Sequence, residues 1–225
     1  MHKITINMPY KAVIAGASGL IGSSLLELLL ASPQYDEVLL LVRKELPLSH
    51  KKLVQVLVDF ERLEDYQASI NGHAVFCCLG STRKKTPDLA AYRKIDHDYP
   101  LQLAQIAVQN RIIQYHLVSA LGADPKSSNF YSKMKGETEE AIKKTGVKSL
   151  HIYEPSLLTG DRKESRPMER FAIFLMKAIN PLLIGSLKKY RSIPAATVAQ
   201  AMYKQSLKTE EGIFVHSSER IKLIV

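Results

Sequence analysis

Three glycines follow a short apolar strand near the start of the chain. Residues 11–22 read Lys-Ala-Val-Ile-Ala-Gly-Ala-Ser-Gly-Leu-Ile-Gly, and an apolar helical pattern continues to Ala31. Gly16 permits a sharp turn, Gly19 leaves room for a pyrophosphate, and Gly22 lets the helix pack closely on the strand. The free N–H groups of the helix then face the phosphates. A purely structural turn is the alternative. The predicted nucleotide contacts are Gly16, Ser18, Gly19, Leu20, Ile21 and Gly22.

Strand-like and helix-like segments alternate along the rest of the chain. Such alternation implies right-handed crossovers and a parallel sheet. We therefore expect an α/β fold, a Rossmann-like doubly wound parallel sheet with helices on both faces and a small C-terminal region. The predicted strands are 12–15, 37–42, 54–58, 74–77, 114–118, 149–153 and 213–216, with a further one at 221–225. The predicted helices are 20–30, 88–109, 129–144, 167–179 and 195–206.

Length and composition limit the class of protein to which this chain can belong. The 225 residues are 46% hydrophobic, which is enough for one core, so we expect a single domain over residues 1–225. Residues 155–194 break the alternation and are predicted to form a substrate cover or a partner-binding segment. Cys77 and Cys78 are adjacent on a strand, which makes them a poor disulfide pair. With no secretory pattern at the N-terminus, a cytoplasmic location is expected.

The formal net charge of +9 admits several kinds of anionic partner. The lysines are scattered and form no long basic run, so we expect a solvated surface and no nucleic-acid partner. The apolar run from Phe171 to Ile184 is interrupted by Lys177 and Pro181, and it is too short to cross a bilayer. It is expected to be core, lid or dimer interface, with a membrane-surface or protein-docking helix as the alternative. A homodimer or a protein partner is left open.

Ser119, Tyr131 and Lys135 carry the predicted chemistry. Tyr131 and Lys135 are four residues apart on one helical face, and Ser119 ends the fifth strand, where that helix begins. A neighbouring ammonium group lowers the pKa of a tyrosine, which can then exchange a proton with a substrate oxygen. Serine can hold the same oxygen by a hydrogen bond. An ordinary exposed helix face is the alternative, since one Tyr-x-x-x-Lys pair is expected by chance.

The second strand ends in Arg43 and Lys44, where proteins that bind NAD usually have an acidic residue. Arg43 can meet a 2′-phosphate with two hydrogen bonds, so the predicted cofactor is NADP, with NAD less favoured. A solvated basic turn is the alternative. Asp59 and Phe60, after the third strand, are predicted to meet the adenine, although Asp59 could equally cap a helix. After the fourth strand, the main chain at Leu79, Gly80 and Ser81 is predicted to run past the ribose.

Several motifs resemble the short-chain dehydrogenase/reductase family, and its atypical branch most closely. Besides the glycine turn and the Ser119, Tyr131 and Lys135 set, they are residues 77–83, 127–131, 135–137 and 161–167. The resemblance covers residues 10 to about 205. It implies a Rossmann-like domain that binds NADP, with Tyr131 as acid–base, Lys135 on the nicotinamide ribose and Ser119 orienting a carbonyl.

Two positions depart from the family pattern. Asp96 stands where the broader family often has asparagine, and an ionised aspartate cannot donate a hydrogen bond in a relay. Glu154 precedes Pro155 where relatives usually have arginine, which inverts a charge near the cleft. His116 and His151 fall within strands and are predicted to be core or edge residues, and no histidines have metal-ligand spacing, so no metal is predicted.

The sequence therefore predicts an NADP-dependent oxidoreductase that acts on a small carbonyl or alcohol. A protein that senses NADPH and has little or no turnover is the alternative, because a Rossmann fold does not by itself settle activity.

Overall fold

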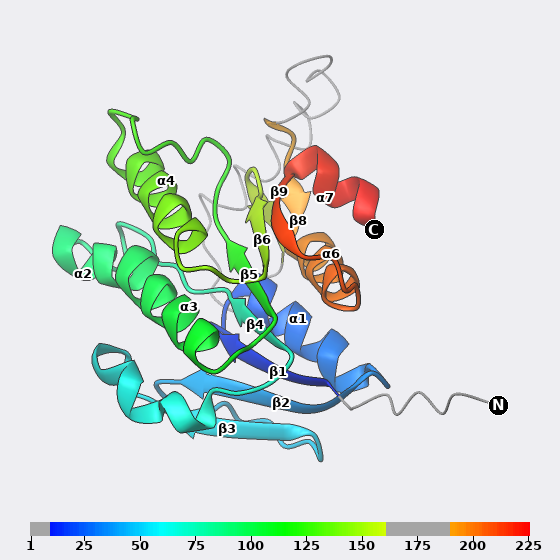
Figure 1. Cartoon of the computed structure of the whole chain (residues 1–225). Coiled ribbons are helices and arrows are strands. Elements are labelled where there is room, and N and C mark those ends of the chain that lie inside the picture. The colour runs from blue at the N-terminus through cyan, green and yellow to red at the C-terminus, as the bar shows by residue number, and fades with distance from the viewer. Residues whose placement is uncertain (1–9, 161–189) are drawn as a thin grey trace.

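The computed structural model describes residues 10–160 and 190–225, and within them a parallel sheet forms the centre of the molecule (Figure 1). Its seven strands lie in the order β3-β2-β1-β4-β5-β6-β9, and every neighbouring pair is parallel. The chain moves outward in one direction from β1 to β3 and then in the other from β4 onward. The predicted Rossmann-like α/β fold is confirmed. The carboxyl ends of β1 and β4, where the strand order reverses, are where such sheets bind ligands.

The strands are β1 (Tyr10–Ala15), β2 (Tyr35–Val42), β3 (Leu53–Leu57), β4 (Ala74–Cys77), β5 (Gln114–Val118), β6 (Ser149–Glu154) and β9 (Gly212–Ser217). A separate parallel pair consists of β7 (Leu158–Thr159) and β8 (Ile193–Pro194). The α-helices are α1 (Leu20–Ala31), α2 (Leu89–Arg93), α3 (Tyr99–Gln109), α4 (Phe130–Lys143), α6 (Ala195–Ser206) and α7 (Ser218–Ile224). A 3₁₀ helix, η1, covers Phe60–Ser69, and a π-helical turn, η2, covers Lys94–Asp98.

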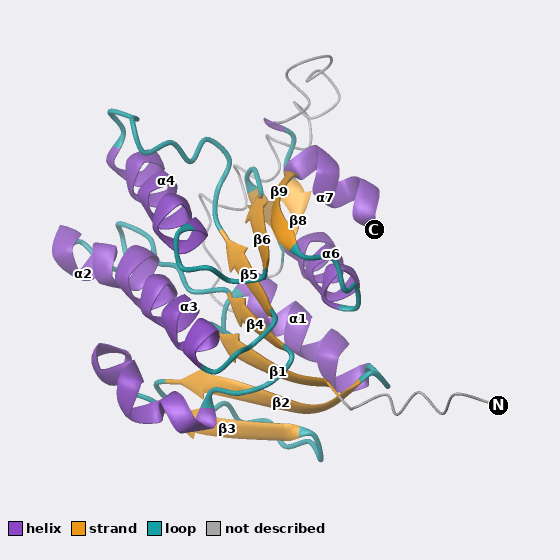
Figure 2. Ribbon diagram, viewed as in Figure 1, coloured by secondary structure: helices purple, strands orange, loops and turns teal. Residues whose placement is uncertain are grey.

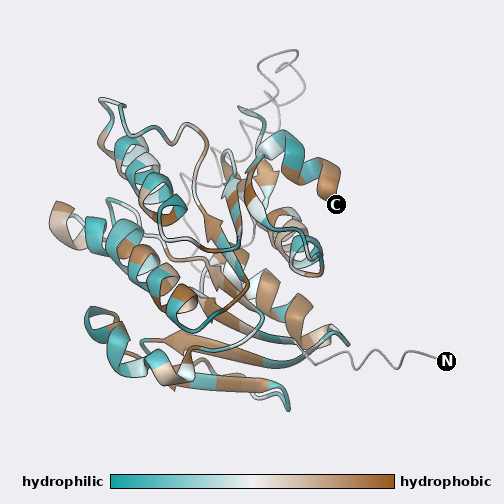
Figure 3. Ribbon diagram, in the orientation of Figure 1, coloured by the Kyte–Doolittle hydropathy of each residue, from teal (hydrophilic) through white to brown (hydrophobic). Residues whose placement is uncertain are grey.

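Helices cover both faces of the sheet (Figure 2). One apolar cluster joins α1 and α6 to the side chains of alternate strand residues such as Ile14 and Phe76. A second cluster joins α3 and η1 to the opposite face through residues such as Val13 and Val75. Strands buried on both faces have nearly continuous apolar sequences, and Figure 3 shows the central strands largely in the brown of hydrophobic residues.

The helix predicted over residues 88–109 is interrupted by a wider turn. Asp88 caps its start by accepting a hydrogen bond from the Ala91 amide at 2.7 Å. The π turn η2 then separates α2 from α3. A π turn holds an extra residue and shifts the face that later side chains present, and such turns are frequent at functional sites. Here the turn contains Asp96, which is fully buried.

The strand predicted over residues 221–225 is wrong, because Ser218–Ile224 form helix α7. The Ser217 side chain accepts a hydrogen bond from the Arg220 amide and starts the helix. Ile221 is buried, whereas Leu223 is 86% exposed, so the apolar residues follow a helical stripe rather than the alternation of a strand.

Only the ends of the segment 155–194 can be described. Its two ends meet, since β7 pairs with β8 and the Ile193 amide donates to the Leu157 carbonyl oxygen at 3.0 Å. The predicted helix 167–179, the motif at 161–167 and the apolar run from Phe171 lie outside the described residues. The role of this segment as a substrate cover stays a prediction.

His116 and His151 are core residues, as predicted. Their rings stack at 4.7 Å, and Phe76 and Phe214 extend the stack on either side, so four cross-strand neighbours on β4, β5, β6 and β9 form one row. His216 adds a third buried histidine, whose Nε2 lies 3.1 Å from Nδ1 of His151. Burial lowers the pKa of all three, to about 4 for His216 and about 3 for His151. These histidines are neutral at physiological pH.

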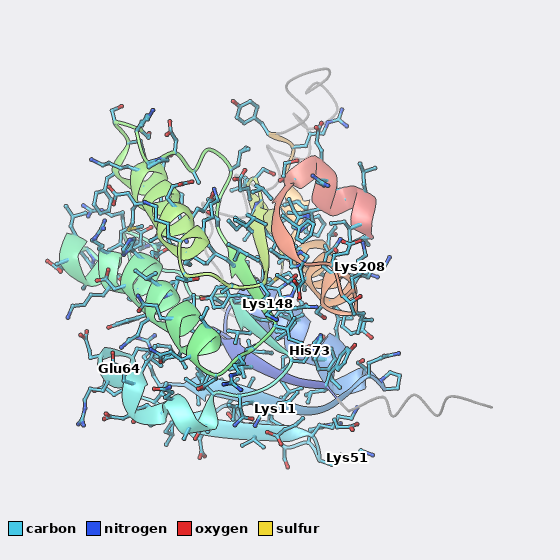
Figure 4. The ribbon with its side chains drawn as sticks, viewed as in Figure 1. Lys11, Lys51, Glu64, His73, Lys148 and Lys208 are labelled. Carbon is cyan, nitrogen blue, oxygen red and sulfur yellow. The ribbon has the colours of Figure 1, made fainter. Side chains whose placement is uncertain are left out.

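Several surface cations lie away from the carboxyl edge of the sheet. Lys11 and Lys51 lie near the amino ends of β1 and β3, and Lys148 immediately precedes β6 (Figure 4). Part of the excess positive charge is therefore on the edge opposite the predicted site. Among residues 10–160 and 190–225, no helix combines the length and hydropathy needed to cross a membrane. In the same residues, no group of three or more His, Cys, Asp or Glu side chains is arranged so that it could hold a metal ion.

Candidate active site

The glycine turn has the geometry that a phosphate needs. Gly16 has φ +90°, and a Cβ placed there would lie 2.5 Å from the Cys78 carbonyl oxygen. A Cβ on Gly22 would lie 2.3 Å from the Gly16 carbonyl oxygen. The first residues of α1 have neither a side-chain cap nor an acidic residue in the first turn. The N–H groups at this positive helix end are therefore free to bind an anion, and the turn fits the pyrophosphate of a dinucleotide.

A pocket of about 320 Å³ opens at the carboxyl ends of β2 and β3. Arg43, Asp59, Phe60, Lys94 and Tyr99 are among its lining residues. The structure thus brings together three residues that were predicted for the adenosine end of the nucleotide. Lys44, predicted to assist Arg43, does not line this pocket. Its volume and its position beside β2 fit an adenine with its ribose.

Asp59 has the capping role that the sequence left open, because its Oδ1 accepts a hydrogen bond from the Glu61 amide at 2.9 Å. It also lines the pocket, so the two roles coexist. Phe60 is 6% exposed and packs on Tyr99 with ring centroids 5.5 Å apart. Phe60 is therefore a nearly buried lining residue of the pocket.

Sequence reasoning missed the charged wall of this pocket. Glu61 accepts hydrogen bonds from Lys94 Nζ at 2.7 Å and from the Tyr99 hydroxyl at 2.6 Å. The bonds from Lys94 and Tyr99 lower the pKa of the Glu61 carboxyl. Lys94 is thus engaged by an acid, which leaves Arg43 as the lining cation that forms no ion pair within residues 10–160 and 190–225. Because Lys94 lies 33 residues beyond Glu61, no sequence motif marks the pair.

Lys135 forms a buried ion pair with Asp96, and its Nζ lies 2.9 Å from Oδ1. The two side chains are 6% and 1% exposed. The other carboxylate oxygen of Asp96 accepts a hydrogen bond from the Ser81 amide at 2.8 Å. Burial disfavours the Lys135 ammonium, but Asp96 and, to a smaller extent, Tyr131 and Cys77 together more than offset it, so the pKa of Lys135 lies above its usual range. Asp96 therefore acts purely as an acceptor, and it ties α4 to the loop after β4.

Tyr131 lies on α4 one turn before Lys135, as predicted. Although 39% of this residue is exposed, burial raises the pKa of its phenol, and Asp96 adds to the increase. Lys135 opposes this increase only in part. The lowered tyrosine pKa expected from the sequence is therefore not found, because burial of the phenol outweighs the effect of Lys135, and Asp96 cancels part of that effect.

Ser119 follows β5 and lies at the carboxyl edge, as predicted. Its hydroxyl donates a short hydrogen bond to Oε1 of Glu139 on α4. Glu139 was not predicted, although it stands four residues after Lys135 and eight after Tyr131, so helical spacing alone places it on their face. This spacing is the signal that could have found it.

A larger hollow of about 700 Å³ lies between α3 and α4 and includes Gln105, Val108 and Ala141. None of the predicted site residues lines it. The smaller pocket beside β2 lies at the carboxyl edge of the sheet, where the glycine turn also lies. It is therefore the candidate nucleotide pocket.

The chain belongs to the NAD(P)H-binding family, whose model matches residues 16–207. Within it, the chain is an atypical short-chain dehydrogenase/reductase, as its motifs indicated. It is 34% identical to the protein HTATIP2 of Rattus norvegicus over 203 residues, which are 88% of this chain and 82% of the rat protein.

Fungal proteins are also similar to this chain. The mitochondrial protein FMP52 of Coccidioides immitis is 28% identical over 94% of this chain and 91% of its own length. The mitochondrial FMP52 of Saccharomyces cerevisiae is 34% identical over 68% of each chain. The expectation of a cytoplasmic location is wrong on this comparison. It rested on reduced cysteines and on a missing secretory signal, which do not distinguish between intracellular compartments.

Solved structures with the same fold are more distant in sequence. MoeE5 in complex with UDP-glucuronic acid and NAD has a TM-score of 0.71 at 17% identity, covering 92% of this chain and 75% of MoeE5. The Bordetella bronchiseptica enzyme WbmH in complex with NAD+ has a TM-score of 0.69 at 17% identity, covering 93% and 75%. These similarities establish the Rossmann-like fold and carry no information about substrate.

Proposed function

We propose that this protein is an NADPH-dependent reductase that acts on a small carbonyl compound. The observation that carries the proposal is the buried Lys135–Asp96 pair, one helical turn beyond Tyr131 and next to the loop that follows β4. Burying an ion pair is costly, and a solvated helix face has no need of one. Together with Ser119, these residues supply the groups that carbonyl reduction requires.

Each residue has a separate task in the proposed reaction. The glycine turn and α1 bind the pyrophosphate, and Lys135 holds the nicotinamide ribose. When bound, the reduced nicotinamide supplies the hydride that adds to the carbonyl carbon. Ser119 holds the carbonyl oxygen, and Tyr131 donates its phenolic proton to that oxygen to complete the alcohol. Tyr131 then regains a proton from solvent.

The raised pKa of Tyr131 favours reduction over alcohol oxidation. Reduction needs a phenol that still carries its proton, whereas oxidation needs a phenolate to accept one. An alkoxide formed by hydride addition is basic enough to take the proton from such a phenol.

The preference for NADPH depends on Arg43 and can be tested by titration. We expect Arg43→Ala to weaken NADPH binding at least tenfold and to leave NADH binding nearly unchanged, because only NADPH has a 2′-phosphate. Lys51→Ala removes the same charge near the opposite edge of the sheet and is the control. Equal affinities of the wild type for the two nucleotides would exclude the role given to Arg43.

Turnover is tested by screening aldehydes, ketones and quinones for NADPH consumption. Tyr131→Phe should lower kcat at least a hundredfold on a genuine substrate, because general acid catalysis contributes about 10²–10⁴ in rate. Tyr203→Phe on α6 is the matched control, since its hydroxyl bonds Ser32, on the α1 side of the sheet. A Tyr131→Phe enzyme as fast as the wild type would rule out the acid role.

A regulatory NADPH-binding protein without turnover is the second candidate. The observation that favours it is the hydrogen bond from Ser119 to Glu139, which uses the hydroxyl proton that a substrate oxygen would need. Tight NADPH binding with no consumption across the substrate screen would support this candidate over the reductase.

A further inference from the structure

Glu139 forms a buried polar contact with Ser119, one of the proposed catalytic residues. Ser119 is 5% exposed and Glu139 is 4% exposed. The Ser119 amide donates to the Tyr153 carbonyl oxygen at 2.7 Å, which fixes the backbone, while its hydroxyl donates to Glu139. A serine hydroxyl has one proton to donate. While that proton is directed at Glu139, it is not available to a substrate oxygen.

The charges around Glu139 do not hold it firmly ionised. Lys143, one turn further along α4, approaches Oε2 only to 3.9 Å and is 2.9 Å from Glu140. Lys135 is engaged by Asp96. Glu154, at the end of β6, faces Glu139 with a charge of the same sign. Among residues 10–160 and 190–225, the ion pair that Glu139 makes is thus only this long one with Lys143.

These surroundings raise the pKa of Glu139 to about 7. Burial is the main cause, and repulsion from Glu154 adds to it. The bond from Ser119 opposes the increase, as do Lys143 and Lys135. Burial also raises the pKa of Glu154. Both protonation states of Glu139 are therefore accessible near neutral pH.

We propose that Glu139 is a positioning residue whose protonation state sets the direction in which the Ser119 hydroxyl donates. Ionised Glu139 accepts the hydroxyl proton of Ser119 and keeps it from the substrate. Protonated Glu139 donates to Ser119 Oγ instead, and the serine proton is then free to bond a carbonyl oxygen. This inference rests on the proposed reductase function, and it predicts reduction that is fastest below about pH 7.

The coupling between the two residues can be measured without any substrate. In ¹³C NMR titrations of the side-chain carboxyls, Glu139 should titrate near pH 7, as identified by its absence in Glu139→Gln. Ser119→Ala removes a donor to the ionised form and should move that midpoint upward by about one unit. Glu154→Gln removes a like charge and should move it downward. Glu137→Gln, on the same helix and bonded to Arg93, should leave it unchanged.

A midpoint in the ordinary glutamate range, or one that Ser119→Ala does not move, would overturn the proposal. These outcomes are independent of turnover, so they are distinct from failure of the reductase function, which would appear as no NADPH consumption by any variant.

The catalytic consequence is tested with Glu139→Gln. A glutamine amide donates to Ser119 Oγ as the protonated acid does, at every pH. The wild-type kcat/KM should fall about tenfold per pH unit above 7, whereas the Glu139→Gln profile should stay flat, which leaves the variant about tenfold faster at pH 8. A merely structural role would lower the rate at all pH values alike. A wild-type inflection near pH 7 that persists in Glu139→Gln would contradict the proposal.

Discussion

The two halves of the carboxyl edge are built on different physical principles. The half around β1 and β2 presents backbone amides and space, because glycines keep side chains out of the turn. The half around β4, β5 and α4 presents buried charge, in the Lys135–Asp96 pair and in Glu139. In the glycine turn, stability should therefore be most sensitive to added size. Around the Lys135–Asp96 pair, it should be most sensitive to lost charge.

The largest expected effect comes from adding one methyl group to the turn. Gly16→Ala combines a positive φ with a Cβ 2.5 Å from a carbonyl oxygen, and we expect a loss of about 3 kcal/mol or more in unfolding free energy. NADPH binding should fall more than tenfold. Both are measured by urea unfolding and by nucleotide titration.

Gly146→Ala is the matched control, because Gly146 has φ +83° and no atom within 4 Å of an added Cβ. It should cost only about 1–2 kcal/mol, the price of the left-handed backbone. If the two variants lost equal unfolding free energy, close packing at Gly16 would contribute nothing to stability.

A change of charge at constant size should affect the other half. Asp96→Asn keeps the shape of the side chain but leaves the Lys135 ammonium buried without a counter-ion. We expect a loss of about 3 kcal/mol in unfolding free energy, and a drop in the pKa of Lys135. Urea unfolding at pH 7 measures the first effect.

Glu137→Gln breaks a more exposed pair of the same kind, since Arg93 and Glu137 are 2.6 Å apart with side chains 41% and 30% exposed. Solvent screening should limit that loss to about 1 kcal/mol or less. If the two variants lost the same stability, burial of the Asp96 pair would not be the source of its strength.

A further effect is a dependence of the unfolding free energy on acid, which arises from the buried histidines of strands β5, β6 and β9. His116, His151 and His216 have lowered pKa values in the folded state, so below about pH 6.5 the unfolded chain binds protons that the folded chain does not. Unfolding free energy should fall as pH falls from 6.5 toward 4, by up to about 1.4 kcal/mol per pH unit for each histidine.

His151→Phe keeps a ring in the stack and removes one titrating group, so it should make the pH dependence shallower in urea unfolding between pH 7 and 5. Glu139 acts with the opposite sign, because its raised pKa gives stability that is present below about pH 4.5 and is lost as pH rises through 7. If the unfolding free energy fell equally steeply with pH in His151→Phe and in the wild type, His151 would have no part in the acid dependence.

The sequence predicted the parallel sheet well because its strands are short, apolar and separated by helices, which are local properties. It failed at residues 221–225, where a strand was predicted and the Ser217 cap starts helix α7 instead. The carboxyl-edge positions of Ser119, Tyr131 and Arg43 were foreseen because the ends of parallel strands meet at one edge. Their roles with nucleotide and substrate stay predictions.

By itself, the sequence determined the nucleotide-binding turn, the order of strands and helices, and the candidate residues along one edge, because each depends on neighbours within a few positions in the chain. Only the tertiary structure decided the charges of the site. It pairs Asp96 with Lys135, Glu61 with Lys94 and Glu139 with Ser119. These partners are 39, 33 and 20 residues apart in the chain. Ionisation depends on burial and on the nearest charges in space, and neither follows from position in the sequence.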